Sequence, residues 1–167
     1  MSMVTSFCAV AAESARVLIL GSMPSVASLK ANQYYAHPRN NFWPIMASIY
    51  GFDAKSEYPS RLQNVINHGI AIWDVLQSCE RSGSLDSAIV NGSRVPNDFD
   101  WFFHMHPHIK LICFNGAEAE NSFRRFVLAQ IDLKDINLIR LPSSSPANTQ
   151  SFEQKKAAWE KVLLCIN

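Results

Sequence analysis

Four short runs of apolar residues recur along the chain, at residues 15–20, 69–75, 110–115 and 136–141. Each run is continuous rather than alternating, which is typical of a strand buried on both faces of a parallel sheet. No apolar stretch in the sequence is long enough to span a bilayer. The pattern therefore predicts four parallel strands.

Segments with helical spacing of apolar residues separate these runs. Gly69 is a C-cap signal, and Ser151 with Gln154 forms a capping-box pattern before the last helix. Helices that alternate with parallel strands cover both faces of a sheet. We therefore expect an α/β fold, a three-layer α/β/α sandwich around a central four-stranded parallel sheet. The predicted helices are residues 26–31, 42–51, 59–69, 116–130 and 151 to the C-terminus.

Composition fits one globular domain over residues 1–167, with 48% hydrophobic and 17% charged residues and no repeat or linker. The net charge of +1 is uninformative about partners on its own. A protein that coats nucleic acid is usually far more basic, whereas one that binds a few phosphates through a local patch need not be. The N-terminus lacks the basic flank of a signal peptide. The cysteines form no CxxC pair and are expected to be buried, reduced thiols of a cytoplasmic protein. They are Cys8, Cys79, Cys113 and Cys165.

Two polar, largely uncharged loops follow the first and fourth predicted strands, at residues 21–43 and 141–149. Ligands of such sheets bind at the carboxyl ends of the strands, so the two loops should face each other across one cleft. Gly21 permits a close approach of the backbone, and Pro24 stiffens the turn. The chain has no GxxxxGK[ST] or GxGxxG motif, so no nucleotide cofactor is expected.

We also expect no metal site. His104, His106 and His108 alternate in "HMHPH", but Pro107 and the lack of further clustered ligands predict a surface loop there.

Specific motifs in these loops resemble the uracil-DNA glycosylase superfamily, and most closely its hypoxanthine-DNA glycosylase branch. The motifs are "GSMPS" (21–25), "QYYAHPRNNFW" (33–43) and "LPSSSPAN" (141–148), with further similarity at 72–89 and 114–119. The resemblance implies an enzyme that extrudes a damaged nucleotide from DNA and hydrolyses the bond between sugar and base. Because none of these three motifs contains a lysine, we expect a monofunctional enzyme that leaves an intact abasic site.

The resemblance also implies a catalytic residue. Most of the superfamily has an Asp or Asn close to the proline of the first loop, where this chain has Ser22 and Met23. In the hypoxanthine branch an Asn of the "PRN" element serves instead, which points to Asn40. Its amide would orient water or bond the base. Asn41 is an alternative, and Asn40 could simply cap a turn or helix.

Other roles come from the same resemblance. Leu141 replaces a frequent histidine, so that histidine's stabilisation of the leaving base is unavailable. Tyr34, Tyr35 and Phe42 could stack on the flipped base, or they could be ordinary core residues. Arg39 could bind a phosphate, or it could pair with a surface carboxylate. Asn115 could read the base edge, or it could cap the end of a strand. Asp74 is expected to be a cap or ion-pair partner, although the resemblance makes it a cavity candidate. The candidate base-binding residues are Ser22, Met23, Tyr34, Tyr35, Phe42 and Asn115; the candidate DNA-binding residues are Arg39, Ser143, Ser144, Ser145 and the wedge Pro146, Ala147 and Asn148.

Three hypotheses follow. The first is a monomeric hypoxanthine-DNA glycosylase, with DNA as its partner. The second is a glycosylase for uracil or thymine mispaired with guanine, which the missing acid or amide of the first loop opposes. The third is a non-catalytic lesion-binding or small-ligand-binding domain on the same fold, which the near-neutral charge favours and the complete loop motifs oppose.

Overall fold

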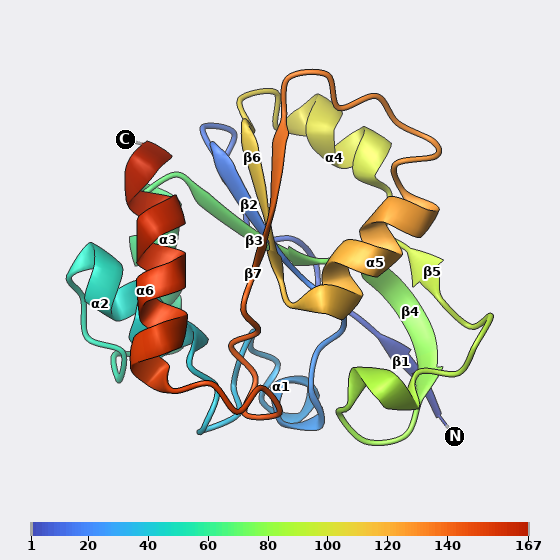
Figure 1. Ribbon diagram of the computed structural model, residues 1–167, viewed down its shortest axis with the longest axis horizontal. Coiled ribbons are helices and arrows are strands. Elements are labelled where there is room, and N and C mark those ends of the chain that lie inside the picture. The colour runs from blue at the N-terminus through green and yellow to red at the C-terminus, as the bar shows by residue number, and fades with distance from the viewer. Residues whose placement is uncertain (1, 167) are drawn as a thin grey trace.

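A four-stranded parallel sheet forms the centre of the molecule, in a computed structural model that describes residues 2–166 (Figure 1). Its strands stand in the order β3-β2-β6-β7, and every neighbouring pair is parallel. They are β2 (Val17–Gly21), β3 (Ile70–Asp74), β6 (Leu111–Asn115) and β7 (Asn137–Leu141). All four predicted strands are confirmed, and β6 separates the first from the fourth.

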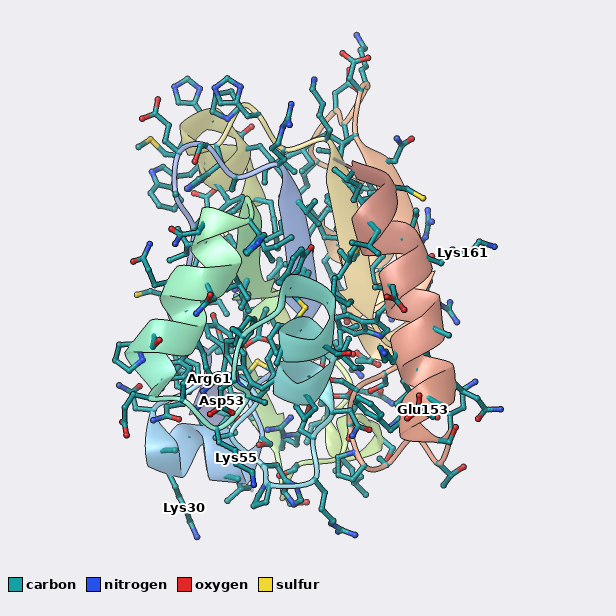
Figure 2. The ribbon with its side chains drawn as sticks, turned by 90° about the vertical axis from the view of Figure 1, so that its left-hand side faces the viewer. Lys30, Asp53, Lys55, Arg61, Glu153 and Lys161 are labelled. Atoms are coloured by element: carbon teal, nitrogen blue, oxygen red, sulfur yellow. The ribbon has the colours of Figure 1, made fainter. Side chains whose placement is uncertain are left out.

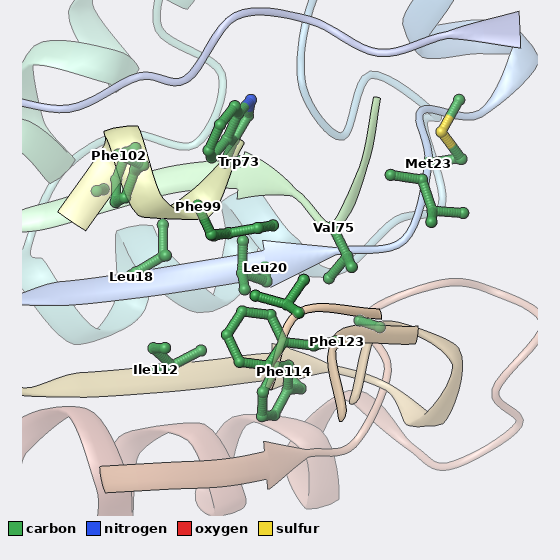
Figure 3. Packing of buried hydrophobic residues seen from close by; sticks show 14 of the residues in the cluster. Leu18, Leu20, Met23, Trp73, Val75, Phe99, Phe102, Ile112, Phe114 and Phe123 are labelled. Carbon is green, nitrogen blue, oxygen red and sulfur yellow. The ribbon is translucent and has the colours of Figure 1, made fainter. Parts of the chain in front are cut away.

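Helices cover both faces of this sheet, so the predicted three-layer sandwich is also confirmed (Figure 1). Successive residues of β2 face opposite layers: Leu18 and Leu20 pack in one core, whereas Val17 and Ile19 pack in the other. Figure 3 shows the first core, where Leu18 and Leu20 lie near aromatic side chains. One face carries α2 (Phe42–Tyr50), α3 (Tyr58–Asn67) and α6 (Phe152–Leu163); the other carries α4 (Phe99–Met105) and α5 (Ala117–Phe126).

Two lysines of the helices point away from the sheet. Lys30, on the short helix α1 (Val26–Ala31), and Lys161, on α6, project into solvent (Figure 2). The Arg61 guanidinium lies over the ring of Trp43, 4.8 Å from its centroid. The surface of α3 thereby covers the aromatic core beneath it.

A second, three-stranded antiparallel sheet was not predicted. It contains β1 (Ser2–Thr5), β4 (Leu76–Arg81) and β5 (Val95–Pro96), in the order β1-β4-β5. These strands are short or mix polar with apolar residues, so no continuous apolar run marks them. The sheet holds the excursion 82–94, which includes the 3₁₀ turn η1 (Asp86–Ala88), beside the carboxyl end of β3.

The surface loop predicted for the three histidines is wrong for His104 and correct for His106 and His108, which follow α4. His104 lies in the last turn of α4, and His106 is the C-cap, with its ring stacked on Phe102 at 4.3 Å between centroids. The helix begins where the Asp98 side chain accepts a hydrogen bond from the Trp101 N–H. Within residues 2–166, no three His, Cys, Asp or Glu side chains cluster as metal ligands.

The expectation of buried cysteines is confirmed for Cys79 and Cys113 and wrong for Cys8 and Cys165, which are exposed. All four thiols are free. Over the described part of the chain, no helix has the length and apolar character needed to cross a membrane.

Candidate active site

One polar cavity opens at the carboxyl ends of the parallel strands. The short helix α1, which follows β2, lies at the lower edge of the molecule in Figure 1. The first loop contributes residues 21–25, and the loop after β7 contributes residues 143–145. The predicted meeting of these two loops across one cleft is therefore confirmed. The remaining wall residues are Ser28, Tyr34, Tyr35, Asn40, Asp74, Ser84, Asp86 and Asn115.

Asn40 lies in the wall of this cavity, and its amide orientation is fixed. Its Oδ1 accepts a hydrogen bond from the backbone N–H of Phe42, at 2.9 Å, at the start of α2. Because an N–H must donate to oxygen, Nδ2 is the group left to bond a ligand, and no side-chain hydrogen bond within residues 2–166 occupies it. The cap considered as an alternative therefore exists, and it positions the amide.

Asn41 is occupied elsewhere and does not line the cavity. Its backbone N–H donates to Ser144 O at 2.9 Å, and its Oδ1 accepts from Lys155 Nζ at 3.2 Å. Lys155 is buried and also donates to Ser145 O, at 3.1 Å. One ammonium group thus joins α6, the start of α2 and the serine loop.

The predicted aromatic residues divide into wall and support. Tyr34 and Tyr35 line the cavity, whereas Phe42 is fully buried and does not. Phe42 instead stacks on Tyr35, with 3.9 Å between ring centroids. It therefore supports Tyr35 from behind and does not make the expected contact with a base. The Tyr34 hydroxyl donates to Cys8 O at 2.9 Å.

Tyr35 combines two unusual features. Its φ of 56° is rare for a residue with a side chain. Its hydroxyl is buried and makes no hydrogen bond of good geometry within residues 2–166. Burial, followed by the nearby Asp74, raises the pKa of the phenol, while the neighbouring Asn115 amide lowers it. An unpaired, neutral donor at a cavity wall is available to a ligand.

Asn115 also lines the cavity, but its amide is engaged. Its Nδ2 donates to Ser144 Oγ and its Oδ1 accepts from Ser144 N–H, both at 2.8 Å. This reciprocal pair supports the strand-end role considered for Asn115 and fixes Ser144, which is fully buried. Only the second N–H of the Asn115 amide remains for a base edge.

The predicted DNA-binding residues separate into an inner and an outer group. Ser143, Ser144 and Ser145 line the cavity; Arg39, Pro146, Ala147 and Asn148 do not. The Asn148 amide braces the loop by donating to Ser143 O at 3.0 Å. Arg39 is exposed and forms no ion pair within residues 2–166, so its alternative role as a carboxylate partner is absent there.

Asp74 is in the wall of the cavity, and within residues 2–166 its side chain neither caps a backbone group nor forms an ion pair. Its side chain is buried, and Oδ2 has no hydrogen-bond partner within residues 2–166. Burial, and then the charge of Asp86, raise the pKa of Asp74 to about 7 from an ordinary 3.8, although Arg81 opposes this shift. Gly21 is required beside it, because a Cβ there would lie 2.5 Å from Asp74 Oδ1.

Sequence reasoning missed the wall that comes from the excursion 82–94. Ser84 and Asp86 line the cavity there, and Ser22 Oγ donates to Asp86 Oδ1 at 2.6 Å. Burial raises the pKa of Asp86, while the hydrogen bond from Ser22 lowers it. Arg81 is buried behind this wall, and its Nη2 donates to Pro24 O. The similarity at residues 72–89 was the available signal for this segment.

Comparison with known proteins identifies the family. A model of the "Uracil DNA glycosylase superfamily" matches residues 8–163. The chain belongs to this superfamily. It is 36% identical over 157 residues to a hypoxanthine DNA glycosylase of Methanosarcina acetivorans, covering 93% of this chain and 95% of the relative. It is 35% identical over 151 residues to a protein of the same description from Methanosarcina barkeri, covering 90% and 91%.

A solved structure of a superfamily protein agrees with the fold. A Methanosarcina acetivorans protein, solved by NMR in solution and provisionally described as a uracil DNA glycosylase, superposes with a TM-score of 0.81 at 33% identity. The match covers 97% of both chains. The predicted superfamily and fold class are both confirmed.

Proposed function

We propose that this superfamily member is a monofunctional DNA glycosylase that removes hypoxanthine from deoxyinosine and leaves an abasic site. The observation that carries the proposal is the Asn40 amide in the cavity wall, whose oxygen accepts from the Phe42 N–H and whose Nδ2 has no side-chain hydrogen bond within residues 2–166. Two relatives described as hypoxanthine DNA glycosylases, at 36% and 35% identity, support this substrate.

The geometry requires a flipped nucleotide. The cavity lies at a sheet edge between loops, and a base within a duplex would not reach Asp74 or Tyr35 in its wall. Extrusion of the nucleotide brings the base into the cavity, and unstacking costs least for a mispaired or damaged base. In this pose Asn40 orients the water that attacks the sugar as oxocarbenium character develops.

The departing base requires stabilisation of negative charge. Asp74, at the end of β3, supplies a carboxyl group. The two loop motifs contain no such group. With its pKa raised to about 7, its carboxyl is neutral in a large share of molecules at neutral pH. A neutral carboxyl both donates and accepts, and is therefore complementary to the N–H and C=O of a deaminated base edge. Tyr35 Oη is a second neutral donor.

DNA contacts fall to the serine loop and the exposed residues around it. Ser143 and Ser145 belong to the loop that leads to α6 and carry hydroxyl groups that can bond a phosphate. Exposed Arg39 supplies positive charge outside the cavity. No lysine lines the cavity within residues 2–166, and Lys155 Nζ is held by Asn41 and Ser145, so hydrolysis rather than imine chemistry follows.

The decisive experiment is cleavage of duplexes that contain one deoxyinosine, one deoxyuridine or one thymidine mispaired with deoxyguanosine, with hot alkali to reveal abasic sites. We expect strand cuts at deoxyinosine, and only after alkali. Cleavage restricted to uracil or thymine would replace the substrate assignment. If no duplex is cleaved, the hypothesis that remains is a non-catalytic lesion-binding domain.

We further propose that the protein acts as a monomer in the cytoplasm. The absence of a membrane-spanning helix within residues 2–166 is compatible with this. Light scattering during size-exclusion chromatography tests the monomer, which should elute near its mass of 18.8 kDa.

A further inference from the structure

Ser22 and Asp86 form a hydrogen-bonded pair in the wall of the cavity. Both residues line the cavity, although one belongs to the first loop and the other to η1. The Ser22 hydroxyl donates to Asp86 Oδ1 at 2.6 Å, a length typical of a hydroxyl bound to an ionised carboxylate. The proposed chemistry of Asn40 and Asp74 leaves this pair without a role.

Backbone contacts hold both members of the pair in place. Ser22 O accepts from the Leu76 N–H at 3.2 Å, which joins the first loop to β4. Ser84 Oγ accepts from the Val26 N–H at 2.9 Å, which joins the excursion 82–94 to α1. The hydroxyl therefore meets the carboxylate within a fixed frame.

Positive charge behind the wall opposes protonation of Asp86. Burial and the nearby Glu118 raise the pKa of its carboxyl. The hydrogen bond from Ser22 lowers the pKa, and so do the charges of Arg81 and Arg94. Arg81 is buried and forms no ion pair of its own within residues 2–166, so its charge is available to balance the carboxylate.

The bond to Asp86 limits what Ser22 can offer a ligand. A serine hydroxyl has one hydrogen to donate and two lone pairs that accept. Because its hydrogen is bound to Asp86, Ser22 can accept from a ligand but cannot donate to it. The hydroxyls of the serine loop are the reverse case, since they accept hydrogen bonds from N–H groups of Ser145, Asn115 and Ala147 and keep their own hydrogens to donate.

We propose that Asp86 fixes Ser22 as an acceptor-only group that selects bases with a ring N–H on their edge, and so favours hypoxanthine over adenine. This inference rests on the proposed glycosylase function. Hypoxanthine presents a hydrogen on ring nitrogen 1 beside a carbonyl, whereas adenine presents a bare lone pair beside an amino group. A lone pair set against Ser22 Oγ leaves two acceptors unpaired and repelling, which is how a polar site rejects the wrong ligand.

The neutral carboxyl of Asp74 does not make this distinction. Its O–H and C=O can face either base, because donor and acceptor exchange places when the carboxyl turns over. Tyr35 Oη can likewise rotate its hydrogen. Adenine could meet Ser22 only through its amino group, one position along the edge, and would then lie out of register with Asp74. Selection against the normal purine therefore falls to Ser22 and Asp86.

The test measures binding of duplexes that contain the 2′-fluoroarabino analogue of deoxyinosine or of deoxynebularine, because the sugar fluorine slows hydrolysis. The nebularine base is a purine with a bare ring nitrogen 1 and neither a carbonyl nor an amino group beside it. Fluorescence anisotropy gives the dissociation constants, and their ratio is the preference for inosine. The pairing strength of each base is the same for every variant, so it cancels when preferences are compared.

Removal of each side chain should reduce the preference in a different way. Ser22→Ala should bind the inosine duplex about tenfold more weakly and the nebularine duplex as well as wild type, because one accepted hydrogen bond is lost. Asp86→Ala releases the serine hydrogen, so the nebularine duplex should bind about tenfold more tightly and the inosine duplex should change by less than about threefold. Asp86→Asn keeps the side-chain volume and can turn its amide to donate to Ser22 Oγ, so it should shift the preference in the same direction if Asp86→Ala does not fold.

Ser87→Ala is the matched control, because Ser87 is an exposed serine of the same turn η1 and does not line the cavity. It should keep the wild-type preference and melting temperature.

The outcomes separate the two proposals. If wild type does not excise the base of deoxyinosine from a duplex, the glycosylase function fails. If wild type excises it and Ser22→Ala keeps the wild-type preference, only the selecting role of Ser22 is overturned. If Asp86→Ala keeps that preference, or loses affinity for both duplexes equally, the orienting role of Asp86 is overturned.

Discussion

Lys155 donates hydrogen bonds from its buried Nζ to Asn41 Oδ1, at 3.2 Å, and to Ser145 O, at 3.1 Å. The two acceptors belong to the two segments that close the cavity from one side. A charged donor in a buried site makes hydrogen bonds stronger than those between neutral groups. The relative position of Asn40 and the serine loop therefore depends on α6.

Replacement of this ammonium should loosen both segments. Lys155→Met keeps much of the side-chain volume but leaves two acceptors without their donor. We expect the free energy of unfolding to fall by about 2 kcal/mol and single-turnover excision to slow about tenfold. Lys156→Met, on the next position of the same helix, is the control. If the two variants behave alike in thermal unfolding and excision, the bridging role of Lys155 is wrong.

Removal of the Asn40 amide should separate catalysis from folding. We expect Asn40→Ala to slow excision about a hundredfold, the usual effect of deleting one positioned hydrogen-bonding group. Loss of the cap to Phe42 N–H should cost about 1 kcal/mol of stability. Asn40→Ser retains a side-chain oxygen that can accept from the Phe42 N–H, but it has no amide N–H to bond a ligand in the cavity.

Asn40→Ser should therefore be nearly as stable as wild type and nearly as slow as Asn40→Ala. Single-turnover rates and thermal denaturation measure the two effects separately. If Asn40→Ala excises the base at the wild-type rate, Asn40 has no role in the mechanism and Asn41 becomes the candidate again.

Protonation of Asp74 should make stability depend on pH. Its pKa is about 7 in the folded protein and 3.8 as an ordinary aspartate, so between these values the folded state binds more protons than the unfolded state. Stability should therefore fall as pH rises from about 4 to about 7, by at most about 4 kcal/mol for this group. Asp74→Asn should flatten this part of the profile, as measured by chemical denaturation at several pH values.

The same titration should appear in excision. If the neutral carboxyl donates to the departing base, the wild-type single-turnover rate should decline as pH rises through about 7. Asp74→Asn keeps a donor and an acceptor without a titratable proton, so its rate should not decline there. A decline of the same midpoint in Asp74→Asn would assign the titration to another group.

Addition of one methyl group at Gly21 tests the packing of the wall. The Cβ of Gly21→Ala would lie 2.5 Å from Asp74 Oδ1 and 3.2 Å from Tyr35 Oη, so Asp74 must move. We expect excision to fall at least tenfold and stability to fall by about 1–3 kcal/mol. The double variant Gly21→Ala with Asp74→Ala should show a smaller stability loss than the sum of the single variants. Additive losses would show that the two side chains do not collide.

The parallel sheet could be predicted because short continuous apolar runs, such as residues 110–115, are typical of strands buried on both faces. The second sheet escaped prediction because β4 mixes polar with apolar residues and buries an arginine, Arg81, against Pro24 O. Its burial depends on tertiary contacts that no local pattern records.

The site was predictable where a motif placed residues next to a strand end. Ser22 and Asn115 belong to that group. Asp86 is separated from β3 by a further strand, so only the folded chain places it beside Ser22. The choice between Asn40 and Asn41 also depended on the structure, because neighbouring amides differ only in which hydrogen bonds occupy them.

The excursion between β4 and β5 has an evolutionary consequence. It provides one wall of the cavity through Ser84 and Asp86, yet the small antiparallel sheet anchors it at both ends, apart from the central strands. Insertions or deletions between those anchors could therefore remodel one wall while the opposite wall keeps its chemistry. A lineage could broaden or narrow the range of lesions it repairs by changing this single stretch of about a dozen residues.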